Sequence, residues 1–298
     1  MKRKNSYLLA LVPFLILVGL FEILPLVMVI IRSFMPENSI GLTLDHYVHI
    51  FTTRLYQQAV LNSILVSAVS SAIGILIAYF GAKAVHEGAP KLQRFFKTIL
   101  SLTSNFAGIP LAFAYIILLG KVGVLVLWGK QHGIEALADF NLYSVWGLMI
   151  IYVYFQIPLA TLLLIPSFHA IRKEWKECVS LMGGSQYIFW IKVGLPALRP
   201  AILGTISVLF ANALAAYATA YALLQNNFSL IPIRLSEQFV GDITQHKEFG
   251  SALAVVLMVL MVFSILINDA ILKKGPLLSS SAFRKKEDAN PGTKEDAK

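Results

Sequence analysis

Residues 177–196 read ECVSLMGGSQYIFWIKVGLP, a segment with paired glycines, two charged side chains and a late proline. It lies between two long apolar stretches, residues 146–168 and 201–224, and the residues just before it are rich in charge. A chain made mainly of apolar runs has little reason to keep such a segment between two of them unless the segment presents a surface. We therefore interpret residues 169–200 as a structured loop that docks a soluble partner.

Composition indicates the class of protein. The 298-residue chain is 57% hydrophobic and 14% charged, with a mean hydropathy of +0.71, whereas soluble domains are about half apolar and about a quarter charged. Crossing a bilayer takes roughly 20 apolar residues of helix, because backbone groups in lipid must bond within their own segment. We predict an all-α polytopic membrane protein. Its six transmembrane helices are expected at about residues 7–31, 59–85, 98–120, 146–168, 201–224 and 251–272.

The basic residues predict the orientation of these helices. With the N-terminus inside, 19 of the 25 Lys and Arg residues fall on the cytoplasmic side and 6 on the outside. Cytoplasmic loops of membrane proteins carry this excess of positive charge. We therefore expect both termini and the 169–200 loop in the cytoplasm. Because the basic residues flank apolar runs and do not form one stripe, the net charge of +9 does not indicate a nucleic-acid partner.

Three regions follow from this pattern. We expect residues 1–58 to form an N-terminal anchor helix and an outer interfacial segment that includes an amphipathic stretch at 42–56. The basic start followed by an apolar run resembles a signal sequence, but the run is too long and lacks a small-residue cleavage site, so we predict an uncleaved anchor. Residues 59–272 would form the transmembrane core with its loop at 169–200. Residues 273–298, rich in Lys, Glu, Ser, Pro and Gly, would form a disordered cytoplasmic tail.

Local signals predict two short helices at an angle within the loop. Residues 172–182 favour a helix, which Gly183-Gly184 would end because glycine takes the left-handed backbone required at a helix C-terminus. Ser185 is suited to cap the next short helix. Pro196 is expected to stop that helix, since proline lacks the backbone N–H.

The same residues carry a family resemblance. The loop resembles that of the permeases of ABC importers, which begins Glu-Ala-Ala, has Gly four residues after the second Ala, and ends in Ile-x-Leu-Pro. The positions that match in identity and spacing are Glu177, Gly183, Leu195 and Pro196. Nine residues separate Gly183 from Val193, which replaces Ile, and Cys178-Val179 replaces the two alanines. The chain is thus similar to type I, MetI-like permeases, and nearest in character to the polyamine, iron, thiamine, sulfate and phosphonate branches.

This resemblance implies a function and a set of partners. In the family the loop seats in a cleft of a cytosolic ATPase, so the ATPase-coupling residues would be Glu177, Gly183, Gly184, Ser185, Leu195 and Pro196. The implied partners are a second permease subunit, forming a heterodimer, two ABC ATPase subunits and an extracytoplasmic solute-binding protein. The chain would lie in the bacterial inner membrane and form half of the solute path. It would not itself be an enzyme, because the ATPase hydrolyses ATP. The substrate would be a small polar or charged solute.

Polar and aromatic residues within the spans are candidates for the solute path, because a polar solute needs side-chain hydrogen bonds at mid-membrane. These candidates are Tyr152, Gln156, Asn212, Tyr217, Tyr221 and Glu22. Each also has a structural interpretation. Tyrosines in a bundle often only pack, and a carboxylate inside a span such as Glu22 can be protonated or paired with another helix.

Other classes of function find less support in the residues. No metal-ligand spacing, cofactor motif or complete phosphate-binding loop is present in the sequence, and the six histidines are scattered. A secondary transporter stays an alternative, although it would be expected to show intramembrane charges or inverted repeats. A membrane-embedded enzyme would need a catalytic constellation that the sequence does not offer.

Overall fold

The structure is a computed structural model that describes residues 4–37, 41–240 and 246–273. Within these ranges the chain consists of helices and connecting segments, with no strand. The helices are α1 (Lys4–Val18), α2 (Leu24–Arg32), α3 (Asp45–Thr52), α4 (Arg54–Glu87), α5 (Pro90–Ser104), α6 (Ile109–Leu119), α7 (Val124–Gln131), α8 (Glu135–Ala138), α9 (Val145–His169), α10 (Lys173–Leu181), α11 (Gln186–Phe189), α12 (Leu195–Leu214), α13 (Tyr217–Leu224), α14 (Ile231–Phe239) and α15 (Lys247–Lys273). Two π-helical turns, Gly19–Ile23 and Trp190–Gly194, and a 3₁₀ turn at Gln225–Asn227 complete the set.

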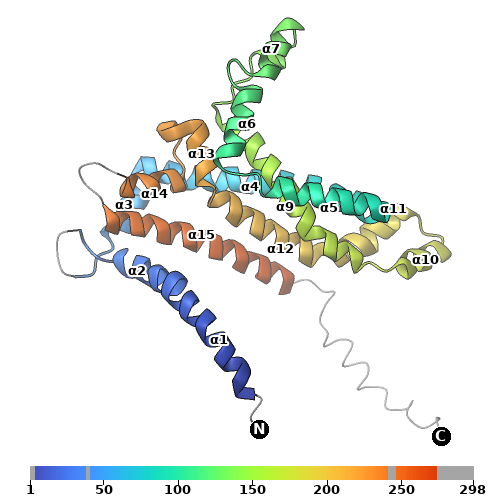
Figure 1. Ribbon diagram of the computed structural model, residues 1–298, viewed down its shortest axis with the longest axis horizontal. Helices are drawn as coiled ribbons and strands as arrows, with labels where there is room; N and C mark the ends of the chain where they lie inside the picture. Colours follow the sequence, from blue (N-terminus) through green and yellow to red (C-terminus); the bar gives the residue numbers. More distant parts are fainter. Residues whose placement is uncertain (1–3, 38–40, 241–245, 274–298) are drawn as a thin grey trace.

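Six helical segments of the described chain are long and apolar enough to cross a membrane, which confirms the predicted number of spans. The bundle is built on α4, which packs against α9 and α12, while α12 also packs against α15. In Figure 1, α10 and α11 lie at one end of this bundle, and α3 and α14 lie at the opposite end. The loop predicted to dock a partner is therefore separated from α3 and α14 by the length of the bundle.

Small side chains let α4 pack closely against its neighbours. The stripe of small residues on this helix is buried, and its members include Ser67, Ser70, Ser71, Gly74, Ala78 and Ala82. Lipid provides no hydrophobic drive for helix association, so close backbone approach through small residues supplies the packing. The stripe therefore joins α4 to helices of its own chain.

The buried apolar side chains form three clusters along the bundle. One lies where α6, α9 and α13 meet and includes Leu111, Leu148 and Leu223. A second lies toward the α10–α11 end and includes Phe168, Phe189 and Trp190. A third, with Ile50 and Phe249, joins α3 to the start of α15. Each end of the bundle thus has its own core.

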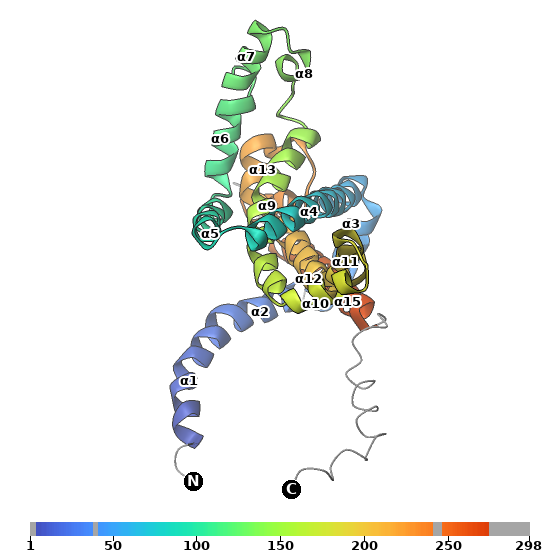
Figure 2. The ribbon, with the colours of Figure 1, turned by 90° about the vertical axis from the view of Figure 1, so that its right-hand side faces the viewer.

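The N-terminal helices lie at the periphery. The segment Leu11–Arg32 contains no residue buried within the chain, and only its second half, α2, packs against α15. Figure 2 shows α1 diverging from the bundle. A helix that is apolar on all sides and uncovered by its own chain must be covered by lipid or by another subunit. The division of the chain at residues 58 and 59 stays a prediction.

The prediction that the third span is one continuous helix over residues 98–120 is wrong. Helix α5 ends at Ser104 and α6 begins at Ile109, with Gly108 between them in the left-handed region at φ 74°. The span continues instead from Ile109 to Gln131, and α6 and α7 project away from the bundle (Figure 1). Residues 101–105, SLTSN, are mostly polar, whereas α6 is apolar throughout, so the sequence itself carries a signal for the break.

The fifth predicted span, residues 201–224, is also wrong at both ends. Helix begins at Gln186, continues through the π-turn into α12, and ends at Leu214, after which Ala215 and Ala216 separate α12 from α13. Pro196 does not stop the helix. Just before it, the Leu195 N–H bonds to the Trp190 carbonyl, five residues back, and Pro196 lies in the first turn of α12, where its missing N–H is tolerated.

The predicted outer interfacial helix at residues 42–56 is represented by α3 and the start of α4. Val48 and Phe51 of α3 are exposed, whereas Ile50 is fully buried against the start of α15. The helix is therefore both attached to the bundle and apolar on its outer side. The predicted disordered tail, residues 273–298, lies outside the described residues except for Lys273.

Candidate coupling surface

The first half of the loop is a helix with a defined glycine stop. At the end of α10, the Gly184 N–H donates to the Val179 carbonyl (2.8 Å) and the Gly183 N–H donates to the Ser180 carbonyl (3.0 Å). Gly183 has φ 76°, in the left-handed region. This pair of nested hydrogen bonds with a left-handed residue is a Schellman motif, which satisfies carbonyls at the helix end. The predicted role of glycine in ending this helix is confirmed.

The second half of the loop starts directly after this stop. Ser185 is the N-cap of α11, and its Oγ accepts a hydrogen bond from the Ile188 N–H (3.4 Å). The predicted cap is therefore confirmed. Gly184 makes the sharp turn possible for a second reason, since a Cβ built there would lie 2.6 Å from Val179 Cγ1 and 2.9 Å from the Val179 carbonyl oxygen. The result is a compact elbow of α10 and α11.

Two aromatic side chains anchor the elbow in the bundle. Phe189 and Trp190 are buried, and the Trp190 ring lies 5.9 Å from the Phe168 ring on α9, centroid to centroid. From Trp190 the helix continues without interruption into α12. A displacement of the elbow is thus passed directly to α12, because no flexible segment separates them.

Lysine side chains reinforce the anchor. Lys176 of α10 pairs with Glu87 at the end of α4 (3.4 Å), and its Nζ lies 5.2 Å from the centre of the Trp190 ring. Lys83 of α4 also places its Nζ 4.5 Å from the centre of that ring. Cation–π contacts of this kind contribute about 0.5–1 kcal/mol each at exposed sites. They join α10 and α4 to the aromatic anchor.

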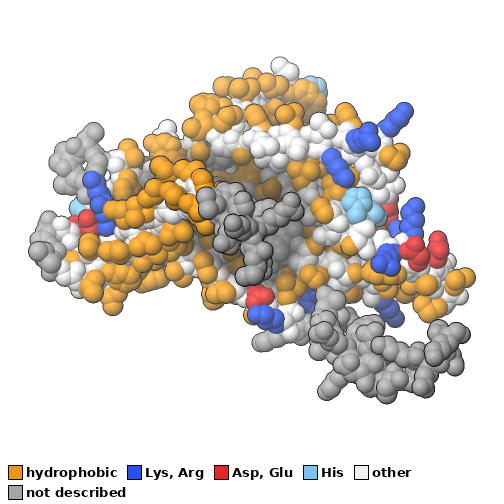
Figure 3. Space-filling model, turned by 60° about the horizontal axis from the view of Figure 1, so that its bottom comes forward, with side chains coloured by type: hydrophobic (Ala, Val, Ile, Leu, Met, Phe, Trp, Pro, Cys, Tyr) orange, Lys and Arg blue, Asp and Glu red, His pale blue; other side chains and the backbone are white. Residues whose placement is uncertain are grey.

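The outer side of the elbow presents apolar side chains. Leu181, Met182 and Tyr187 are 88%, 78% and 74% exposed, and Glu177 is also exposed. The Glu177 carboxylate makes no hydrogen bond or ion pair within the described chain. Figure 3 shows Lys and Arg side chains mainly toward the end of the molecule where α10 and α11 lie. An exposed apolar tip with a free carboxylate, surrounded by charged residues, is typical of a protein–protein contact.

Leu195 and Pro196, the other matched positions, lie on the α12 side of the elbow. Leu195 is exposed, and Pro196 is half-buried. Both fall in the first turn of α12, directly after the π-turn. They therefore belong to the rigid connection between the elbow and the bundle, and Glu177 lies on the separate helix α10.

The solute-path candidates separate into two groups. Tyr152 and Gln156 of α9 are buried inside this chain. The Gln156 Nε2 donates to the Ser70 hydroxyl (2.7 Å), and the Ser71 hydroxyl donates to Gln156 Oε1 (3.2 Å). In this arrangement both side chains have partners within the chain, so a solute would reach them only after the helices move.

The remaining path candidates are more accessible. Asn212 on α12 is exposed, and Tyr221 on α13 is 44% exposed. Tyr217 stacks on Tyr221 with ring centroids 5.2 Å apart. Glu22 lies in the π-turn of the peripheral N-terminal helix and is exposed, whereas Gln156 is buried between α9 and α4. The structure therefore does not bring the six candidates into one site.

The curated relatives that the chain resembles are all named as permease proteins. No protein-family model matches the chain. A probable ABC transporter permease protein of Sinorhizobium fredii is 25% identical over 84% of this chain, which spans only 43% of that relative. The spermidine/putrescine transport system permease protein of Haemophilus influenzae is 24% identical over 83% of this chain and 87% of its own length. A probable sulfate transport system permease protein of Prototheca wickerhamii is 21% identical over 70% of this chain and 78% of its own length.

Solved structures decide the fold. A bacterial ABC transporter involved in the import of the acidic polysaccharide alginate contains a chain that matches 90% of this chain and 97% of its own length, with a TM-score of 0.69 and 19% identity. The chain has the fold of an ABC importer permease. The alginate transporter in complex with a pentasaccharide-bound periplasmic protein gives a TM-score of 0.71 over 91% of this chain and 97% of its own, also at 19% identity. The predicted resemblance of the chain to permeases of ABC importers is thereby confirmed, whereas the roles of the matched residues in 177–196 stay predictions.

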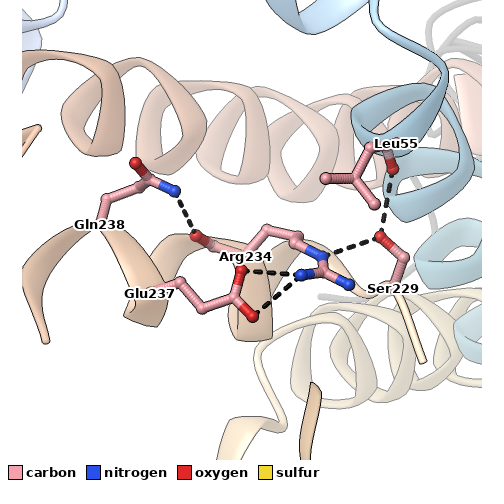
Figure 4. Close-up of polar contacts among 5 residues, drawn as sticks. All are labelled: Leu55, Ser229, Arg234, Glu237 and Gln238. Atoms are coloured by element: carbon pink, nitrogen blue, oxygen red, sulfur yellow. Dashed lines mark hydrogen bonds and ion pairs between the residues drawn. The ribbon is translucent and has the colours of Figure 1, made fainter. Parts of the chain in front are cut away.

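The permease fold also contains a polar cluster that sequence reasoning missed. Arg234 of α14 donates through Nη1 to both oxygens of Glu237 (2.9 and 2.8 Å) and through Nε to the Ser229 hydroxyl (3.0 Å). Ser229 in turn donates to the Leu55 carbonyl of α4 (3.1 Å), and Gln238 donates to the Arg234 carbonyl (Figure 4). Through these hydrogen bonds the cluster connects α14 to the first turn of α4. The sequence signal for this ion pair was the spacing of three residues between Arg234 and Glu237, which places both side chains on one face of a helix.

Proposed function

We propose that this chain is the transmembrane permease subunit of an ABC importer, forming half of the solute path and coupling it to a cytosolic ATPase through residues 169–200. The single observation that carries the proposal is the elbow. It is locked by its own hydrogen bonds, presents Leu181, Met182 and Glu177 outward, and continues as one helix into α12. Such a construction transmits force from a docked protein to the bundle. In this proposal the chain moves solute and does not hydrolyse ATP.

The proposal includes three kinds of partner. Two ABC ATPase subunits would seat the elbows of two permease subunits, and the second permease would make the pair a heterodimer. The apolar surfaces of residues 11–18 and of the projecting α6 and α7 support a further membrane partner, because little of them is covered within the described chain. An extracytoplasmic solute-binding protein would deliver the solute, as the periplasmic protein bound to the alginate transporter supports by similarity.

Location and substrate class complete the proposal. The six spans make this a multi-pass membrane protein, and we place it in the bacterial inner membrane with both termini cytoplasmic. The substrate is a small polar or charged solute. Relatives named for sulfate and for spermidine/putrescine support a charged solute without selecting one. The buried amide and hydroxyl groups around Gln156 would offer hydrogen bonds to such a solute once the helices part.

The experiment is reconstitution with a matched pair of variants. The tagged chain is purified from its native membranes in mild detergent, and any co-purified protein is tested for ATP hydrolysis and for solute-binding-protein stimulation in vesicles. In this proposal the Glu177 carboxylate faces a basic residue of the ATPase. Glu177→Ala is expected to lower stimulated hydrolysis about 30-fold or more, because removing one partner of a buried interface charge pair costs about 2 kcal/mol or more. Glu174→Ala, on the same helix, is the control and should retain stimulation.

Two results would contradict the proposal. The first is that wild-type chain purifies without any ATPase and supports uptake driven by an ion gradient, which would make it a secondary transporter. The second is that Glu177→Ala retains stimulated hydrolysis as Glu174→Ala does. This result would contradict the role of Glu177 in the coupling surface and would leave the importer function itself in place.

A further inference from the structure

Helix α13 is a short segment with a break at each end. Before it, the chain leaves helical geometry at Ala216 (ψ 84°). After it, Gln225 has φ 48° and ψ −131°, and it is the one non-glycine residue of the described chain with a positive φ. A residue with a Cβ is strained in this conformation and keeps it only when its surroundings impose it. Strain of this kind concentrates at sites that switch or clamp, so α13 is a candidate moving part.

A buried hydrogen bond holds the first break. Tyr152 of α9 is 2% exposed, and its hydroxyl donates to the Ala216 carbonyl, the residue just before α13, at 2.6 Å. A small cavity lies beside this contact, lined by residues of α4, α9, α12 and the segment before α14 that include Ser67, Tyr152 and Leu214. The bond fixes the N-terminal end of α13 against α9, and the cavity has room for about one water molecule.

Other contacts join α13 to elements on its far side. The Ser236 hydroxyl of α14 donates to the Tyr217 hydroxyl (3.0 Å). The Ala218 side chain faces Gly108, in the break between α5 and α6, since a Cβ built on Gly108 would lie 3.7 Å from the Ala218 Cβ. A movement of α13 would therefore be felt both at α14 and at the start of α6.

We propose that α13 is a gate element with two positions. The Tyr152–Ala216 hydrogen bond stabilises the position seen here, and the strained backbone at Gln225 destabilises it. The inference rests on the proposed transport function, which requires the path to open and close. Tyr152 is a positioning residue in this scheme, because it acts through α13. Helices that switch between two positions commonly pivot at a few residues at element ends that absorb the backbone change.

The scheme predicts opposite effects for two substitutions. Tyr152→Phe removes the hydroxyl and weakens the position seen here, and the loss of one neutral buried hydrogen bond corresponds to roughly a fivefold change in the equilibrium. Gln225→Gly removes the strain at φ 48° and strengthens the same position, by a similar factor. The control is Tyr154→Phe on the same helix, since the Tyr154 hydroxyl makes no hydrogen bond within the described chain.

The experiment measures the exposure of Ala218. In membrane vesicles carrying the complex, with Cys178 replaced by Ser, the variant Ala218→Cys is reacted with a maleimide and the rate is recorded. We expect the rate to rise about fivefold in Tyr152→Phe, to fall in Gln225→Gly, to return toward the parent value in the double variant, and to stay unchanged in Tyr154→Phe. A purely structural role of Tyr152 would change the melting temperature without these opposite shifts.

The results separate the gate from the proposed function. If Tyr152→Phe and Gln225→Gly change the rate in the same direction, or leave it unchanged, the gate is refuted, even when an ATPase co-purifies and transport is normal. If the opposite shifts appear but no ATPase co-purifies, α13 is a two-position element of a different kind of transporter. If Tyr152→Phe fails to insert in the membrane, Gln225→Gly alone tests the gate. Only a strained hinge at Gln225 predicts that Ala218→Cys reacts more slowly with the maleimide in this variant.

Discussion

Replacing Gly183 tests the contribution of one backbone conformation to the proposed docking of an ATPase. The residue has φ 76°, and a Cβ built on it meets no heavy atom within 4 Å. The cost of a side chain there is therefore conformational and not steric. The left-handed conformation costs an L-residue roughly 1–2 kcal/mol, so Gly183→Ala is expected to weaken ATPase docking by about 5- to 30-fold. Gly183→Val should cost more, because β-branched residues are especially disfavoured at positive φ.

Two further variants separate conformation from space. Gly183→Asn should retain docking within a fewfold, because Asn tolerates the left-handed region better than other non-glycine residues. Gly184→Ala should weaken docking for the other reason, since its Cβ would lie 2.9 Å from the Val179 carbonyl oxygen and 2.6 Å from Val179 Cγ1. Reducing Val179 to Ala removes the second of these clashes and should recover part of the loss.

The assay is titration of the purified ATPase onto permease held in lipid nanodiscs, with circular dichroism as a check on insertion and helix content. The expected order of affinity is wild type, Gly183→Asn, Gly183→Ala and Gly183→Val. The reasoning is refuted if Gly183→Val binds as tightly as wild type with normal stimulation of hydrolysis, because the left-handed elbow would then be unnecessary. Equal losses for Asn and Ala would show that the side chain itself, and not φ, obstructs the interface.

Three other predictions test the topology, the anchor and the buried amide. A membrane-impermeant maleimide should label the exposed Cys178 in inverted vesicles stripped of ATPase and not in intact cells, and labelling from outside would reverse the orientation. Trp190→Ala should lower the free energy of unfolding by about 3–5 kcal/mol through the lost buried ring, measured by thermal unfolding in detergent, whereas the exposed Tyr187→Ala should leave it nearly unchanged. Gln156→Leu should lower it by about 1–2 kcal/mol by removing partners of two serine hydroxyls, and Asn212→Leu, at an exposed position, serves as the comparison that should not.

Predictions from local signals succeeded where the chain alone sets the geometry. The elbow could be predicted without a structure, because its helix end and helix start depend on hydrogen bonds between residues three to five positions apart. These bonds involve Gly183, Gly184 and Ser185. The sequence gives no sign, however, of a steric restriction at Gly184. The close approach of Val179 to Gly184 makes both positions restrictive, and this contact depends on how tightly the elbow folds back.

Hydropathy by itself determined that the chain crosses a membrane six times, because the cost of placing polar side chains in lipid is read directly from composition. It did not determine every position where a helix breaks. The break at residues 105–108 has local signals in the polar residues 101–105 and in Gly108, whereas the one at 215–216 lies inside a continuous apolar run. That second break receives a contact from a distant helix, the Tyr152 hydroxyl on the Ala216 carbonyl, 64 residues away in sequence.

The same distinction holds for the polar residues. Sequence selected Gln156 as a polar group at mid-membrane, but only tertiary packing supplied Ser70 and Ser71 as its partners, some 85 residues away. The cluster around Arg234 likewise depends on the Leu55 carbonyl, which lies 174 residues from Ser229 in sequence. A buried polar group must be paired wherever a partner can be found. Sequence therefore determined which groups needed partners, and the three-dimensional fold decided which residues supplied them.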